Sequence, residues 1–170
     1  MKESVGITQL YALVVVLIIL FAGIMAFAIN RANSFAIKDK IVNILEKHDG
    51  FDLTHELIGG MDYSDCDQEH FDDALEEIVC SLQELSYRQT GVCPEFEGNV
   101  EVVGYQRNGT KTTGNNKSSF CIVKQSGNAS KSGVVNMYYY QVIVFYHLDL
   151  PIVRQLFSFK NIGQTKALYQ

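Results

Sequence analysis

The residues best suited to chemistry are carboxylates crowded into one short stretch, residues 62–77. Hard oxygen ligands of this kind can bind Ca²⁺. A calcium loop of the EF-hand type needs Gly at its sixth position and a bidentate Glu at its twelfth, and the stretch lacks that pattern. We interpret it instead as the acidic start of a helix, where the helix dipole favours negative charge. The carboxylates are Asp62, Asp65, Asp67, Glu69, Asp72, Asp73, Glu76 and Glu77.

The other polar residues indicate neither a zinc site nor a catalytic centre. The histidines form no HExxH motif and no pair at i and i+4, and the sequence has no nucleophile elbow and no Gly-rich phosphate loop. The net charge of −5 argues against nucleic-acid binding, which needs a basic face. We therefore expect a non-enzymatic protein without cofactor, metal or nucleic-acid partner. The four histidines are His48, His55, His70 and His147.

Four cysteines lie beyond residue 60, and an even number in a small domain indicates two disulfides with three connectivities. Buried free thiols are the alternative. We expect Cys93 to pair with Cys121, because that bond would join the exit of a helix to a strand. Cys66 then pairs with Cys80.

An uncharged stretch of twenty residues, Leu10 to Ile29, dominates the start of the chain. As a helix it spans about 30 Å, which is the thickness of the hydrocarbon core of a bilayer. A cleaved secretory signal would have a shorter apolar core. The sequence therefore predicts a transmembrane helix at 10–29, preceded by a short leader or tail at 1–9. Within the span, three small residues allow close approach of a second helix, and we predict helix packing there: Ala22, Gly23 and Ala26.

The helix is expected to continue beyond the membrane as an amphipathic extension, 30–49. Apolar residues recur there at helical spacing, and Gly50 is a natural stop. Thr8 to Lys47 would then form one continuous helix of roughly 60 Å. The expected apolar face comprises Phe35, Ile37, Ile41, Ile44, Leu45 and His48.

Residues 50–170 are expected to form an α+β domain. Phe71, Leu75, Ile78, Leu82 and Leu85 follow a helical period and predict a second helix, capped by Asp65 or Asp67 and ending near residue 87 or 88. Beyond Gly98 the period changes to two, which predicts an antiparallel sheet of four to five strands.

Details of the strand region follow from composition. Residues 108–119 are polar and predict a loop, Gly91 predicts a turn, and the last two strands read as a hairpin around residues 161–164. The aromatic strand MYYYQVIVFYHLDL offers Tyr138, Tyr140 and Tyr146 to a partner or to the core. We favour the core, with one row of rings against the long helix.

Two features of the sequence favour opposite orientations of the chain in the membrane. Arg31, Lys38, Lys40 and Lys47 follow the span, and the positive-inside rule alone would favour a cytoplasmic domain. The cysteines and the polar loops favour an exported one. We expect a single-pass protein of the cell membrane with an extracytoplasmic domain.

The opening of the chain resembles that of type IV pilins and pseudopilins. The leader MKESVG would end at Gly6, and the mature chain would begin with Ile7 and Thr8. Prepilins typically have a Gly before the cleaved bond, followed by an apolar residue and then Thr, and Gly6, Ile7 and Thr8 match this pattern. Family members usually have Glu at the fifth mature position, where this chain has Tyr11. The resemblance implies prepilin-type processing between Gly6 and Ile7.

The layout is also similar to TadE-like, pseudopilin-like proteins of Gram-positive pilus and conjugation-type clusters. The similar segments are ITQLYALVVVLIILFAGIMAF, SYRQTGVCP and LDLPIVRQLFSFKNIGQTKALYQ. The resemblance implies a minor structural or assembly subunit of a surface filament or secretion machine. Its partners would be the lipid bilayer and other pilin-like subunits or assembly-platform proteins. The alternative is a membrane-anchored extracytoplasmic binding module, a sensor or adhesin.

Overall fold

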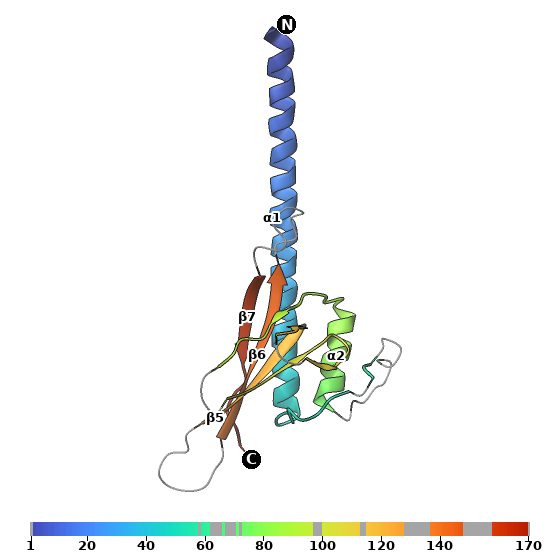
Figure 1. The fold of residues 1–170 in the computed structure, drawn as a ribbon, viewed down its shortest axis with the longest axis vertical. Helices are drawn as coiled ribbons and strands as arrows, with labels where there is room; N and C mark the ends of the chain where they lie inside the picture. Colours follow the sequence, from blue (N-terminus) through green and yellow to red (C-terminus); the bar gives the residue numbers. More distant parts are fainter. Residues whose placement is uncertain are drawn as a thin grey trace.

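The helix α1 (Lys2–Lys47) extends from the N-terminus into the domain without interruption, as Figure 1 shows. The computed structural model of the chain describes residues 2–57, 59–61, 66, 71, 73–96, 100–112, 115–127, 137–147 and 158–169. The first half of α1 stands free of the domain, while its second half lies along the strands β6 (Met137–His147) and β7 (Ser158–Gln164). The continuous helix expected from the sequence is confirmed.

The packed half of α1 buries one face because apolar residues return every three or four positions. Ile37, Ile41 and Leu45 are fully buried, whereas Phe35 is 39% exposed and lies outside the core. The prediction for Phe35 is wrong because its ring lies on the outer side of the helix, beside the cations of Arg31 and Lys38. The buried Ser34 lies on the packed side, and its hydroxyl donates to the carbonyl of Arg31.

The end of α1 differs in detail from the expectation. The left-handed residue is Asp49, with φ of 52°, and Gly50 follows with φ of 130°. The N–H of Gly50 donates to the carbonyl of Leu45 at 3.1 Å, which closes the last helical turn in the manner of a Schellman motif.

The second helix, α2 (Ala74–Glu84), packs beside α1 through the same core. Its N-cap is Asp73, later than the sequence predicted, and Asp65 and Asp67 lie outside the described residues. It ends before residue 87, because Ser86 takes a left-handed conformation with φ of 50° and the N–H of Tyr87 donates to the carbonyl of Leu82.

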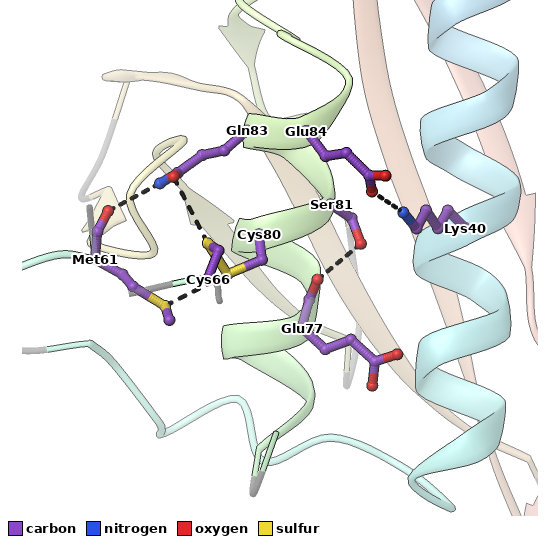
Figure 2. Close-up of a disulfide and its surroundings, with 8 residues drawn as sticks. All are labelled: Lys40, Met61, Cys66, Glu77, Cys80, Ser81, Gln83 and Glu84. Atoms are coloured by element: carbon purple, nitrogen blue, oxygen red, sulfur yellow. Dashed lines mark hydrogen bonds and ion pairs between the residues drawn. A yellow bond between two sulfur atoms is a disulfide. The ribbon is translucent and has the colours of Figure 1, made fainter. Parts of the chain in front are cut away.

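Ion pairs and one disulfide hold α2 in place, as Figure 2 shows in part. Lys40 on α1 contacts Glu84 at 2.6 Å. The disulfide Cys66–Cys80 ties the preceding segment to α2, and the side-chain amide of Gln83 donates to the carbonyl of Met61 at 2.9 Å. The segment before α2 is thereby fixed to the helix by both a covalent bond and a hydrogen bond.

The antiparallel sheet has the strand order β3-β2-β5-β6-β7, with β8 also paired to β6, and a separate two-stranded sheet joins β1 to β4. The α+β class is confirmed. The strands are β1 (Gly91–Val92), β2 (Val100–Tyr105), β3 (Lys111–Thr112), β4 (Lys117–Ser118), β5 (Phe120–Gly127), β6 (Met137–His147), β7 (Ser158–Gln164) and β8 (Leu168–Tyr169).

Three expectations about the strands are wrong. Residues 161–164 belong to β7, and β7 and β8 lie one after the other along the same edge of β6 rather than forming a hairpin. Residues 108–119 contain two short strands because β2 and β1 each pair with part of this segment. Gly91 lies in β1, where a Cβ atom would meet the Phe145 ring at 2.2 Å, so this glycine permits a close approach rather than a turn.

The strand β6 sends its side chains alternately to two faces of the sheet. Tyr140, Val142 and Val144 face the helices and belong to the main core. Ile143 and Phe145 face away and form a second apolar cluster, together with Cys121. The favoured structural interpretation of the aromatic strand therefore holds for Tyr140, which is 2% exposed.

Candidate functional site

The free part of α1 is the first feature that could carry function. Between Leu10 and Ile29 its side chains are mostly exposed, and the most apolar window of the helix is only 6% buried. A helix of this hydropathy that belonged to a core would be largely buried. The helix is long and apolar enough to cross a membrane, and it is the one such helix in the described part of the chain.

The small residues predicted for helix packing lie on this free part of α1. Ala22 is exposed, Ala26 is half-buried, and Gly23 is the one buried position between Leu10 and Ile29. Gly6 and Ile7 lie within α1, and their side chains fall outside the described part.

A cluster of three aromatic rings marks the level at which the domain begins. Phe27 lies 5.7 Å from Tyr146 on β6 and 5.6 Å from Phe159 on β7, measured between ring centres, and the latter two rings stack at 5.2 Å. The side chain of Asn30 donates to the carbonyl of His147 at 3.4 Å, near the same level. The domain therefore follows the apolar segment directly, without a linker.

The second feature is a groove of about 1070 Å³ on the face of the sheet away from α1. Residues 88–94 form one side, and Phe145 and His147 of β6 with Lys160 of β7 form another. Lys117, paired with Val92 in the small sheet, completes it. Phe145 and His147 alternate with Tyr146 along β6, and Lys160 follows Phe159 in β7. The groove and the aromatic cluster therefore lie on opposite faces of the same strand ends.

Positive charge dominates the groove although the chain as a whole is acidic. Arg88, Lys117 and Lys160 line it, and no described lining residue is acidic. Elsewhere the lysines of α1 are paired, Lys40 with Glu84 and Lys47 with Glu77. Among the described residues, no carboxylate lies within ion-pair distance of the three groove cations. The arrangement suits an anion, because unpaired cations on a preformed wall bind one without first breaking an ion pair.

Three links hold the wall of the groove in shape. The hydroxyl of Tyr87 donates to the carbonyl of Phe145 and accepts from its N–H at 2.9 Å. Burial raises the pKa of this tyrosine, which keeps the hydroxyl protonated and able to donate. The disulfide Cys93–Cys121 anchors the segment to β5, and the side-chain carbonyl of Gln89 lies 2.7 Å from Nδ1 of His147.

The ion pairs between α1 and α2 form a structural cluster rather than a site for chemistry. Glu77 contacts Lys47 at 2.9 Å and His48 at 3.0 Å. Burial raises the pKa of Glu77, but hydrogen bonds and attraction from Lys47 and His48 outweigh it and hold the pKa below its ordinary value. Among the described residues, no three of His, Cys, Asp and Glu come together as metal ligands. Most of the acidic stretch 62–72 lies outside the described residues.

The disulfides are those expected from the sequence, Cys66–Cys80 and Cys93–Cys121, and they account for all four cysteines. The groove, in contrast, was missed. Its cations are scattered over 73 positions between Arg88 and Lys160, and only the pairing of β1 with β4 and of β6 with β7 brings them together. A local signal was present only in the glycine at position 91, which marks a close approach of backbone to side chain.

Comparisons with known proteins identify no relative: no family model, no curated protein and no solved structure matches the chain. The functional argument therefore rests on the geometry of α1, the aromatic cluster and the groove.

Proposed function

We propose that this chain is a single-span membrane protein that serves as a non-catalytic, pilin-like minor subunit or assembly factor of a surface filament or secretion machine. One observation carries the proposal: α1 is a single uninterrupted helix whose first half is bare and apolar and whose second half packs against a sheet. A bare apolar helix must be covered by lipid or by other helices. The same surface can thus anchor the subunit first and form part of a helical shaft later.

The proposed orientation places the domain outside the cytoplasm. Two disulfides and no free cysteine fit an oxidising compartment, because cytosolic thiols are kept reduced. The positive charges that follow the span, such as Arg31, favour the opposite orientation by the positive-inside rule. We give the disulfides more weight, since two structural pairs would not persist in a reducing compartment.

The proposed partners are the bilayer and other pilin-like subunits or assembly-platform proteins. The small residues Ala22, Gly23 and Ala26 would allow a neighbouring helix to approach this part of α1 closely. Pilin-type docking through a Glu at the fifth mature position is not part of the proposal, because Tyr11 takes that place and is 70% exposed.

A second candidate function, a membrane-anchored binding module, is favoured by the cationic groove. Helix packing in a filament does not require a concave cationic surface, whereas a sensor or adhesin that binds an anion would use one. The two candidates differ in what they require of α1: a filament subunit needs specific helix contacts, whereas an anchor needs only apolar length.

The experiment that tests the proposal is the intact mass and the N-terminal peptide of the protein isolated from its native membranes. A chain that begins at Ile7 supports prepilin-type processing and membership of a filament system. A chain that retains Met1 contradicts processing and leaves an uncleaved anchor, which favours the binding module. Isolation from cells treated with a thiol-blocking reagent reports the cysteine state in the same sample, and four free thiols would contradict the exported orientation.

A further inference from the structure

The cationic groove lies at the end of the domain nearest the apolar half of α1. His147 lines the groove, and its backbone carbonyl accepts a hydrogen bond from the side chain of Asn30. Asn30 directly follows the apolar stretch. Lys160 is two residues along β7 from Ser158, the partner of His147, and so lies about 7 Å farther along the strand. This distance is comparable to the thickness of the headgroup layer of a bilayer.

The aromatic cluster fixes the same level independently. Phe27 belongs to the apolar stretch and contacts Tyr146 and Phe159. A tyrosine at the end of a span, such as Tyr146 in this cluster, is typical of the interface between hydrocarbon and water. Because Tyr146 and Phe159 neighbour His147 and Lys160 in their strands, a bilayer positioned by this cluster would bring lipid phosphates level with the groove.

We propose that the groove binds the phosphate headgroup of an anionic lipid in the leaflet on the domain's side of the membrane. Arg88 offers the planar fork that matches phosphate oxygens, and Lys160 adds a mobile ammonium. Lys117, paired with Val92 in the small sheet, adds a third cation. The groove, at about 1070 Å³, has room for a headgroup beyond its phosphate. This inference rests on α1 crossing a membrane, as in the proposed function, and is independent of processing and of filament assembly.

The shape of the groove is set before any lipid arrives. Tyr87 and Cys93 are tied to β6 and β5 on either side of the segment that carries Arg88. A preformed wall reduces the ordering cost of binding. The bound lipid would hold the domain in one orientation relative to the bilayer, since α1 fixes one point of the domain and the groove a second.

The test uses the full-length protein in nanodiscs of phosphatidylcholine in which part of the lipid is replaced by phosphatidylglycerol. After gentle extraction, native mass spectrometry gives the amount of phosphatidylglycerol retained on the protein divided by the amount of phosphatidylcholine retained. The wild type is expected to retain phosphatidylglycerol preferentially. The double variant Arg88→Gln/Lys160→Gln should lower that ratio roughly tenfold, since each cation near an anionic lipid surface contributes measurably to binding.

The matched control is Lys40→Gln/Lys166→Gln. It also removes two positive charges, but from ion pairs with Glu84 and Glu46 outside the groove. It should retain the wild-type ratio. Equal thermal unfolding of the two double variants shows that folding is not the cause. An equal loss of lipid selectivity in both, or no selectivity in the wild type, overturns the proposal.

A second arm separates lipid from free phosphate. Inorganic phosphate in excess should leave phosphatidylglycerol retention unchanged, because α1 holds the groove at a high local concentration of lipid. Displacement of the lipid by inorganic phosphate would assign the groove to a soluble anion and overturn the lipid proposal. Neither arm depends on where the mature chain begins, so failure here leaves the proposed filament function to its own test.

Discussion

The hydroxyl of Tyr140 bridges both backbone groups of Phe51, accepting from its N–H at 3.1 Å and donating to its carbonyl at 2.9 Å. Tyr140 lies on β6 and Phe51 directly follows the turn that ends α1, so one side chain joins the sheet to the end of the long helix. Tyr87 contacts Phe145 in the same way at the other end of β6. Two tyrosines thus satisfy buried backbone groups that no strand reaches.

Tyr140→Phe should lower the free energy of unfolding by about 2 kcal/mol, because the N–H and carbonyl of Phe51 would stay buried without this partner. The measurement is denaturant unfolding of the full-length protein in detergent micelles, followed by near-ultraviolet circular dichroism. Tyr139→Phe removes the same atom from the opposite face of β6 and should have little effect. Equal stability of the Tyr140 variant and the wild type would show that the bridge contributes nothing net.

Glu77→Gln should destabilise the protein at neutral pH by about 1 kcal/mol, because it removes the carboxylate that Lys47 and His48 share. The folded-state pKa of Glu77 lies below its ordinary value of 4.5. The stabilisation is therefore present above that value and is lost as the pH falls through the folded-state pKa. The difference between variant and wild type should therefore shrink as the pH falls below 4.5.

Unfolding curves across this pH range provide the measurement for Glu77, with Glu84→Gln as the control. Glu84 pairs with Lys40 on the same two helices, but solvent screens that exposed pair, so its variant should show a smaller difference. A destabilisation by Glu77→Gln that stays constant with pH would point to packing rather than charge.

Gly91→Ala should destabilise the protein by about 1–3 kcal/mol, because the added Cβ would overlap the buried Phe145 ring. The same change should weaken the groove, since Gly91 and Phe145 both line it. Thermal unfolding measures the first effect and anionic-lipid retention the second. Val92→Ala, at an exposed position of β1 in the same groove lining, is the control for stability and should leave the unfolding temperature unchanged. A fully stable Gly91→Ala variant would mean that the strand shifts without cost.

Gly23→Leu should disrupt assembly while leaving membrane insertion intact, because leucine prevents the close approach of a second helix yet suits lipid at least as well as glycine. Ala26→Leu should act in the same direction. We expect filament or secretion output to fall by about tenfold, with unchanged protein in the membrane fraction. Ile24→Leu, an exchange at an exposed position of equal size, is the control. Normal output from both variants would favour a simple anchor.

Local periodicity in the sequence was sufficient to predict the long helix and the sheet. The uncharged run Leu10 to Ile29 and the spacing of Ile37, Ile41 and Leu45 predicted α1, and alternation beyond residue 98 predicted the sheet. Such patterns are visible because each residue's neighbours in space are also its neighbours in the chain. The pair Cys93–Cys121 was expected because a helix exit and a strand had already been placed, and Cys66–Cys80 was the pair that remained.

The groove and the links around it depend on how distant segments pack together. Arg88 and Lys160 line the same groove for two reasons. The strand β7 pairs with β6, and the hydroxyl of Tyr87 accepts from the N–H of Phe145 on β6, beyond the end of β5. The two residues of β1 form a strand only because Lys117 and Ser118 lie opposite them. Backbone groups must find partners when buried, and which distant segment supplies them depends on the packed fold, so local pattern cannot reveal it.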